Sequence, residues 1–159
     1  MENKEQGMTT FEKLSAINVN DKTEKKKNLT YLSWAWAWSE VKKACPDATY
    51  EMGETTYDEA LGFMCYSSVT IDGETLPMWL PVMDGANKAM KKVAYSYATK
   101  YGDKQVAQAS SFDINKTMMR CLVKNLAMFG MGIYIYAGED LPEIETEQAE
   151  SKVNAKAKA

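Results

Sequence analysis

The sequence predicts an α+β protein in which an antiparallel sheet follows one helix in the chain and precedes a longer one. Three observations support this fold class. The chain has 159 residues, which suits a single domain with short tails. Residues 49–82 alternate with the period of strands, whereas residues 34–45 and 114–129 repeat apolar positions with the period of helices. An apolar content of 45% excludes a wholly disordered chain.

The two ends of the chain differ in composition from its middle. Residues 1–8 and 143–159 are rich in charged and poor in apolar side chains, so we expect a disordered N-terminus, one domain over residues 9–142 and a flexible charged tail. The first residues, MENKEQG, contain no apolar segment of a secretory signal, and no apolar run is long enough to span a membrane. We therefore expect a soluble protein in the cytoplasm of the cell that makes it.

A short helix is predicted at the start of the domain. Thr9 and Glu12 have the spacing of a capping box, which satisfies backbone N–H groups at a helix start. The residues expected on its apolar side are Phe11, Leu14 and Ile17. The next run, DKTEKKK at residues 21–27, has no apolar side chain. We interpret it as a charged linker, and a flexible basic arm is the alternative.

Tryptophan and alanine alternate over residues 34–38, which fits either a strand with a tryptophan face or a helix. Ser33 is a favourable N-cap, alanine is the best helix former, and Pro46 ends the segment, so we predict a helix. Its buried stripe is expected to contain Trp34, Trp38, Val41 and Cys45. Trp36 then points to the opposite, polar side, where a large aromatic is typical of a subunit contact or a stacking platform for a base.

An antiparallel meander is predicted over residues 49–82. Its strands are separated by Asp72-Gly73, a dipeptide typical of tight hairpin turns. Pro77 and Pro81 assign the third run to a sheet edge or a bulge, because proline cannot donate a ladder hydrogen bond.

A second hairpin is predicted after the meander. Tyr95 and Tyr97 alternate with small residues in VAYSYATKY, which favours a strand that turns at Gly102-Asp103 and returns through residues 104–110. A helix over residues 85–99 is the alternative. The two tyrosines are further candidates for base stacking or subunit contact.

The long C-terminal helix is predicted to begin after Asp113 as its N-cap and to end before Gly130, a suitable left-handed residue. Its apolar stripe contains Ile114, Met118, Cys121, Leu122 and Phe129. Lys116, Arg120 and Lys124 are spaced by four residues on another side, so their charges repeat every ~6 Å. Such a stripe is either a solvated face or a phosphate-binding one. The following residues, GMGIYIYAGEDLPE, predict a glycine-spaced strand or loop that closes the domain.

Charge is divided unevenly along the chain, although the net charge is only −3. Between Pro46 and Gly85 there are eight acidic residues and no Lys or Arg. Between Lys88 and Lys124 there are eight basic residues and two acidic ones. The candidate phosphate-binding residues are Lys88, Lys91, Lys92, Lys100, Lys104, Lys116, Arg120 and Lys124. One basic surface indicates a polyanion, or the acidic face of a second subunit, as its partner.

The sequence lacks the residues and motifs that several kinds of catalysis and cofactor binding require. There is no histidine, and the three cysteines fit reduced, buried thiols better than disulfides or metal ligands. No phosphate-binding G-x-x-x-x-G-K-[ST] loop and no dinucleotide-binding G-x-G-x-x-G motif is present. We therefore expect no cofactor, no metal and no covalent catalysis. Carboxylate pairs that remain candidates for Mg²⁺ are Asp47 with Glu51, Asp58 with Glu59, and Glu139 with Asp140, each more simply a solvated loop.

Three segments resemble the Sak-type phage single-strand annealing proteins, distant relatives of the Rad-fifty-two annealing domain, Redβ and Erf. They are YLSWAWAWSEVKKACPDATYE, LPVMD and SFDINKTMMRCLVKNLAMFGMGIYIYAGEDLP, and the resemblance covers residues 11–142. It implies a helix, a three- to four-stranded antiparallel sheet and a long helix packed across it. It also implies ring or helical oligomers that hold single-stranded DNA in a basic groove and pair complementary strands without ATP.

The resemblance assigns few residues. The basic position before the Leu-x-x-Phe-Gly turn falls on Lys124, and Arg120 lies one turn earlier; Lys116 is added from its spacing alone. The segment between Asn87 and Ser111 is longer than the usual pattern, so the DNA-binding role of its lysines is our inference. A single-strand-binding protein and an exonuclease are candidate protein partners, and no membrane is expected.

Two other functions fit the same residues. The first is a small metal-dependent nuclease that uses Asp47, Glu51 or Asp58. The second is a structural oligomer in which the acidic meander contacts the basic helix of a neighbouring copy, without nucleic acid. Both are kept as alternatives to a DNA-annealing protein.

Overall fold

The computed structural model describes residues 7–26 and 29–137 of the chain. The helices are α1 (Thr10–Ser15), α2 (Trp34–Ala44) and α3 (Ser111–Met128), with short 3₁₀ helices η2 (Asn20–Lys22) and η3 (Ile133–Tyr136). The strands are β1 (Thr23–Lys26), β2 (Leu29–Leu32), β3 (Thr49–Met52), β4 (Thr56–Asp58), β5 (Gly62–Ile71), β6 (Glu74–Pro81), β7 (Tyr95–Thr99) and β8 (Gly102–Val106). The predicted tail over residues 143–159 and most of the predicted N-terminal disorder lie outside the described residues.

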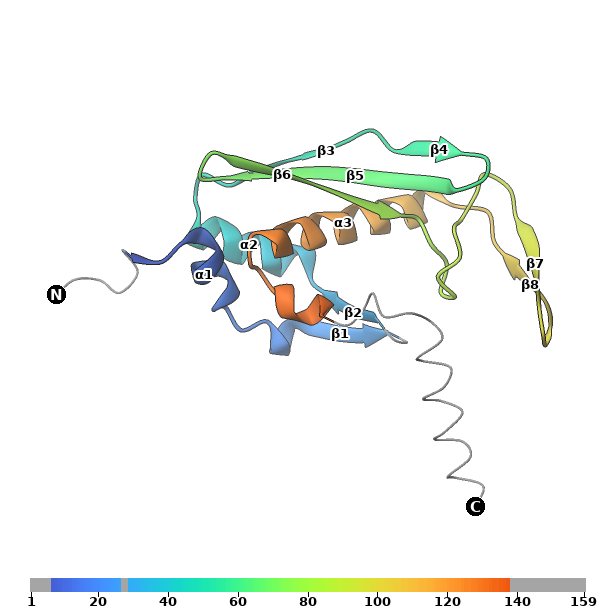
Figure 1. Ribbon diagram of the computed structural model, residues 1–159, viewed down its shortest axis with the longest axis horizontal. Coiled ribbons are helices and arrows are strands. Elements are labelled where there is room, and N and C mark those ends of the chain that lie inside the picture. The colour runs from blue at the N-terminus through green and yellow to red at the C-terminus, as the bar shows by residue number, and fades with distance from the viewer. Residues whose placement is uncertain (1–6, 27–28, 138–159) are drawn as a thin grey trace, which may run out of the picture.

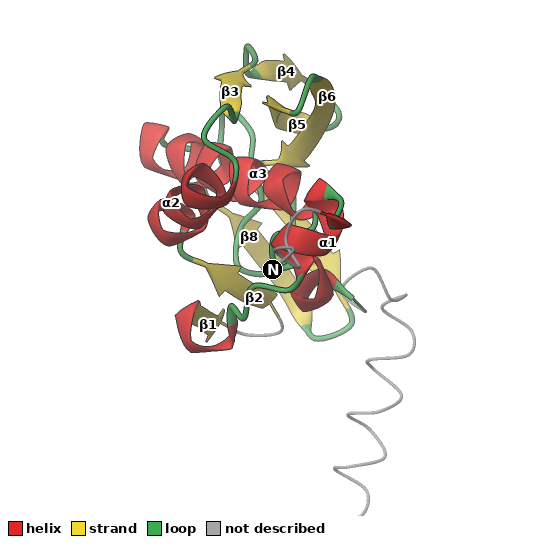
Figure 2. Ribbon diagram, turned by 90° about the vertical axis from the view of Figure 1, so that its left-hand side faces the viewer, coloured by secondary structure: helices red, strands yellow, loops and turns green. Residues whose placement is uncertain are grey.

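The elements form layers. Figures 1 and 2 show the sheet of β3–β6 on one side of α3, and the β1–β2 hairpin with η3 on the other. The β7–β8 hairpin lies at the end of the molecule where α3 begins (Figure 1). This arrangement confirms the predicted α+β class, with an antiparallel sheet and a long helix packed across it. No helix within the described ranges has both the length and the apolar character needed to cross a bilayer.

The main sheet is built around β5. Strand β6 pairs along one edge of β5, while β3 and β4 share the other edge. At the β5–β6 turn, Asp72 and Gly73 both have positive φ, 52° and 77°, as a two-residue hairpin turn requires. Pro77 and Pro81 lie on β6, which pairs with β5 alone among the described strands. The predicted meander, its turn and its proline-bearing edge strand are therefore confirmed.

The second hairpin is also confirmed, but its turn lies elsewhere. Thr99 pairs with Gly102, so the loop consists of Lys100 and Tyr101 rather than the predicted Gly102-Asp103. Gly102 has a φ of 112° and begins β8. With this register, Tyr95 and Tyr97 fall on the same, half-buried face of β7.

Helix α2 begins after Ser33, and Val41 and Cys45 are buried as predicted, but the positions of Trp34 and Trp36 were predicted wrongly. Ala37 and Val41 are fully buried, whereas Trp34 is 47% exposed and Trp36 is half-buried against the main core. Ala37 belongs to the main core, where its small side chain allows close approach of neighbouring elements and a tryptophan would not. Trp36 and Trp38 pack on the flanks of this contact, and Trp34 is left facing outward.

Helix α3 carries a cap at each end. Ser110, not Asp113, is the N-cap: its hydroxyl accepts from the Asp113 N–H, and the Asp113 carboxylate accepts from the Ser110 N–H, 2.9 Å away. At the other end Gly130 has a φ of 112° and donates to the Ala127 carbonyl, while Met131 donates to the Leu126 carbonyl. A Cβ at Gly130 would lie 2.6 Å from the Phe11 carbonyl oxygen, so glycine also permits the approach of α1.

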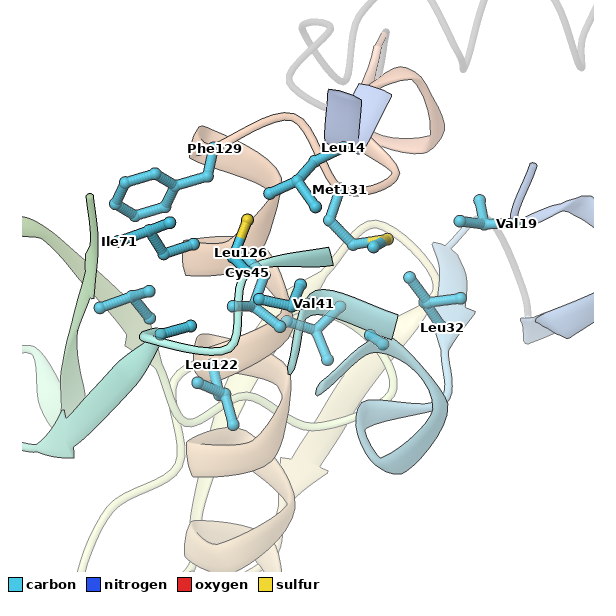
Figure 3. Packing of buried hydrophobic residues seen from close by; sticks show 14 residues of the cluster. Leu14, Val19, Leu32, Val41, Cys45, Ile71, Leu122, Leu126, Phe129 and Met131 are labelled. Atoms are coloured by element: carbon cyan, nitrogen blue, oxygen red, sulfur yellow. The ribbon is translucent and has the colours of Figure 1, made fainter. Parts of the chain in front are cut away.

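The main core lies where α1, α2 and α3 meet the sheet (Figure 3). Leu14, Val41, Ile71 and Leu126 are among its buried side chains. A buried polar link also joins helix and sheet, because Asn125 accepts from the Ser67 hydroxyl at 2.8 Å and donates to the Leu76 carbonyl at 3.0 Å. Because the link joins one side of α3 to two strands, it restricts both sliding of the helix along its axis and rotation about that axis. A smaller cluster of buried residues lies beneath the β7–β8 hairpin: Cys65, Val82, Met90 and Val106.

Two predictions at the N-terminus require correction. Thr9 caps α1 as expected and Leu14 is buried, but Phe11 is 45% exposed. The charged run after residue 20 is not a linker in its described part, because Thr23–Lys26 pair with Leu29–Leu32 as an antiparallel hairpin. An exposed two-stranded ribbon needs little apolar content, so charge alone did not reveal it. After Gly130 the chain forms η3, whereas a strand or loop was predicted.

Candidate nucleic-acid interface

A groove lies between α3 and the β1–β2 hairpin and is bounded by the loop at residues 83–87. Its cavity measures about 400 Å³ and is lined by Lys26 and Tyr31 from the hairpin, Asp84 and Asn87 from the loop, and Lys116 and Arg120 from α3. The sheet packs on the opposite side of α3 (Figure 1), so the groove lies away from the acidic meander. Two smaller depressions adjoin it, and Arg120 lines all three.

Two of the three cations predicted on the long helix, Lys116 and Arg120, line this groove, and the third, Lys124, lines an adjoining depression. Lys116 is exposed and lines the groove and one of the adjoining depressions. Arg120 and Lys124 are half-buried, and Lys124 lines the depression next to Tyr136. Because residues four apart lie about one turn apart on a helix, the three charges form a row along one side of α3.

Aromatic rings, rather than carboxylates, accompany Lys26, Arg120 and Lys124. The Arg120 guanidinium lies 4.7 Å from the centre of the Tyr31 ring, and the Lys26 amine lies 5.8 Å from the same ring. The Lys124 amine lies 5.9 Å from the centre of the Tyr136 ring. Across residues 7–26 and 29–137 the only ion pair joins Lys43 to Glu40, on α2. An aromatic face orients a cation while leaving its N–H donors available for an incoming anion.

One acidic residue lies in the groove. Asp84 Oδ1 accepts from the backbone N–H groups of Ala86 and Lys88, both at 2.9 Å. Its carboxylate therefore shapes the loop, which also contains Asn87 at a positive φ of 61°. Hydrogen bonding to the loop partly satisfies this charge, and the groove remains rich in positive charge because Lys26, Lys116 and Arg120 line it as well.

A second group of cations surrounds the β7–β8 hairpin. Its lysine amines lie near tyrosine ring centres in four pairs: Lys88 and Tyr97 at 4.9 Å, Lys91 and Tyr95 at 4.8 Å, Lys92 and Tyr57 at 4.5 Å, and Lys100 and Tyr101 at 5.2 Å. Lys104 is exposed on β8, opposite Tyr97 in the register. Burial, with a smaller contribution from Asp84, raises the pKa of Tyr95. Its phenol is therefore neutral and donates to the Ala89 carbonyl.

The structure thus divides the eight predicted cations into two groups. Lys116, Arg120 and Lys124 form the groove group, and the five lysines between residues 88 and 104 form the hairpin group. Sequence reasoning missed Lys26 and Tyr31, which belong to the groove. The one available signal was the basic-arm alternative for residues 21–27, because it placed a functional charge in that segment.

Two of the carboxylates proposed for a metal site, Asp47 and Asp58, hold local structure through hydrogen bonds to backbone N–H groups. Asp47 accepts from the Asp72 N–H at 2.9 Å, and Asp58 accepts from the N–H groups of Ala60 and Leu61. Within the ranges that the structure describes, no three His, Cys, Asp or Glu side chains come together as a metal site would require. Glu139 and Asp140 lie outside these ranges.

The three cysteines are free and buried, as predicted. Burial raises the pKa of Cys45, Cys65 and Cys121, so the thiols stay protonated at neutral pH. A protonated, inaccessible thiol is a poor nucleophile. These residues act as small apolar side chains of the core.

The chain was compared with known proteins. A family model described as Sak Single Strand Annealing Protein matches residues 9–159. No curated protein matches the chain. The match extends over the helices, the sheet, the basic groove and the hairpin, and it supports a general role in single-strand annealing. The chain therefore belongs to the Sak single-strand annealing protein family.

Proposed function

We propose that this protein binds single-stranded DNA in the groove beside α3 and anneals complementary strands without ATP, in the homologous recombination of a phage. The observation that carries the proposal is the basic lining of one groove by Lys26, Lys116 and Arg120, which Lys124 extends into the adjoining depression. Arg120, Lys124 and Lys26 rest on aromatic rings and have no carboxylate in ion-pair range within the described residues. The N–H groups of these three side chains are therefore available to donate hydrogen bonds to phosphates.

The proposed mechanism needs no covalent chemistry. The cations neutralise phosphates and hold one strand in an extended form, which lowers the repulsion that a second strand would meet. Base pairing between the two strands then supplies both the specificity and the driving force. The protein therefore does not read the sequence, and the energy of nucleotide hydrolysis is not required.

We also propose that the hairpin group extends the DNA surface beyond the groove. Lys88 and Lys91 follow the groove loop directly in the chain, and Lys92, Lys100 and Lys104 continue the positive charge onto the hairpin. Tyr95 and Tyr97 lie beneath two of these lysines, where they orient the amines. Trp36 remains a candidate for a subunit contact through the part of its ring that is not buried.

Self-association is part of the proposal. A head-to-tail contact between copies that leaves the basic groove free for DNA produces rings or filaments. A single-strand-binding protein and an exonuclease are the proposed protein partners, because one coats single strands and the other produces them. The proposed location is the host cytoplasm, and the proposed processes are recombination and DNA repair.

The decisive experiment is annealing of complementary fluorescent oligonucleotides without nucleotide or metal. If six cations contact phosphates, the logarithm of the single-strand affinity falls with the logarithm of salt concentration at a slope of about −4. Arg120→Ala with Lys124→Ala flattens this slope and slows annealing. Lys13→Ala with Lys43→Ala, which removes the same charge from α1 and α2, leaves both unchanged. A slope near zero for the unaltered protein rejects the proposal.

The two alternatives are separated by simple observations. A metal-dependent nuclease shortens labelled DNA in Mg²⁺ or Mn²⁺, whereas an annealing protein leaves its length unchanged. A purely structural oligomer gives no gel shift with a single-stranded oligonucleotide. The mass of the particle before and after DNA is added measures self-association in each case.

A further inference from the structure

One depression beside the groove combines two exposed aromatic side chains with charged and polar ones. It measures about 290 Å³, close to the lower end of small-molecule sites, and lies between α2 and the first turns of α3. Its lining includes Trp34, Phe112, Asn115, Met119, Lys116 and Arg120. The last two residues also line the groove, so a strand held there passes beside this depression.

Two aromatic rings at this depression are unusually accessible. Trp34 is 47% exposed and Phe112 is 72% exposed. The first follows the N-cap of α2 and the second lies in the first turn of α3, so neither is needed to fill the core. Large aromatic side chains that face solvent beside a cationic groove are the usual platforms for stacking unpaired bases.

The remaining lining residues complement a nucleobase. Asn115 is exposed and brings an amide that both donates and accepts hydrogen bonds, as the edge of a base does. Met119 adds a polarisable apolar wall, which suits contact with a flat ring. Lys116 and Arg120, at the boundary with the groove, are placed to hold the phosphates on either side of that base.

We propose that this depression, lined by Trp34 and Phe112, is a nucleobase subsite that receives one unpaired base of the strand bound in the groove. The inference rests on the proposed function, because it requires a strand in the groove. Through this contact a base is turned away from its neighbours, which interrupts stacking along the strand at intervals of one subunit. The remaining bases stay open to a complementary strand.

The test compares two oligonucleotides of equal length, one of thymidines and one made only of abasic sites, at fixed salt. Both present the same phosphates, so their ratio of affinities measures the contribution of bases. For the unaltered protein we expect the thymidine strand to bind more tightly. Trp34→Ala should weaken thymidine binding about tenfold and leave abasic binding and the salt slope unchanged. Trp34→Phe, which keeps an aromatic face, should retain most of the preference.

Matched variants make the result specific. Trp79→Ala removes another exposed tryptophan, on the outer sheet face, and should change neither affinity. Phe112→Ala repeats the test from the other wall, at a position so exposed that folding is not at risk. The inference is overturned if Trp34→Ala keeps the full preference for bases, or if it instead reduces the mass of the oligomer. Failure of the unaltered protein to bind either strand would reject the proposed function as well.

Discussion

Two regions on opposite sides of α3, the outer face of the sheet and the groove, both expose aromatic residues but differ in charge. On the outer face of the sheet, Tyr66 and Trp79 lie opposite each other in the β5–β6 register and are 38% and 58% exposed. Glu51 and Asp58 belong to the same face by strand alternation. In the groove, by contrast, Tyr31 lies beneath two cations. Both regions present aromatic rings, but only one presents them with positive charge.

This difference teaches that aromatic exposure alone does not identify a DNA surface. Residues 46–85 contain no Lys or Arg, so the sheet they form repels a polyanion whatever rings it displays. The groove instead collects cations from two separate segments, Lys26 from the β1–β2 hairpin and Lys116 and Arg120 from α3. Changes to the groove side should therefore alter DNA binding, and changes to the outer face should alter stability or assembly.

The largest effect is expected from the hairpin group. Replacing Lys88, Lys91, Lys92, Lys100 and Lys104 together by alanine should weaken single-strand binding by on the order of a hundredfold or more. The salt slope should flatten toward about −3, the value for four groove cations alone. Fluorescence anisotropy over a series of salt concentrations measures both quantities.

The outer face provides the control for this variant. Glu51→Gln with Glu54→Gln also raises the net charge, but at a distance from the groove, and should change affinity less than about threefold. An unchanged salt slope in the hairpin variant would confine the DNA to the groove and remove the hairpin from the binding surface.

The next largest effect concerns the link that holds α3 between the two regions. Asn125→Leu leaves the Leu76 carbonyl without its donor and the Ser67 hydroxyl without its acceptor. We expect a loss of about 2–3 kcal/mol in the free energy of unfolding, measured by urea denaturation. Asn115→Leu, at an exposed position of the same helix, should cost less than about 0.5 kcal/mol. Equal losses would show that the buried link is unimportant.

A smaller effect is expected at Gly53, on the outer face. An added Cβ would lie 2.9 Å from the Tyr66 Cβ, so Gly53→Ala must displace β3 or the tyrosine. We expect a cost of about 1–2 kcal/mol in thermal or urea unfolding, with DNA affinity unchanged per folded molecule. Gly7→Ala, which meets no atom within 4 Å, is the control. A change of salt slope in Gly53→Ala would contradict the conclusion that the outer face of the sheet takes no part in DNA binding.

The smallest effect is a pH dependence at the start of α3. The backbone N–H of Ser110 is the main cause that lowers the pKa of Asp113 below its usual 3.8, and the Ser110 hydroxyl and Lys116 add to it. A lowered folded-state pKa means that this stabilisation is complete above pH 4 to 5 and is lost as pH falls below 3.8. Unfolding of Asp113→Asn and the unaltered protein should therefore converge in acid. A constant difference down to pH 2.5 would contradict this.

Much of the local structure could be predicted because it depends on short-range chemistry. Asp72-Gly73 determines its own turn, the prolines determine an edge strand, and the spacing of Lys116, Arg120 and Lys124 determines that they share a side of one helix. The same holds for the alternation of Tyr95 and Tyr97.

Other features could not be predicted because two or more residues of one segment were equally suited to the same role. Trp34, Trp36 and Trp38 are identical as residues, and only the packing of α2 with Ala37 in the core decided which of them is exposed. Ser110 and Asp113 are both good caps, and their reciprocal bonds assigned the cap to Ser110.

The sequence by itself determined the fold class, the strand edges and the separation of charge along the chain, because periodicity, turn residues and charge are properties of neighbouring residues. Only the tertiary structure decided that the basic helix faces the β1–β2 hairpin, and that Tyr31 and Lys26 lie beside Arg120. These contacts join residues about ninety positions apart in the sequence. No pattern within one segment contains that information.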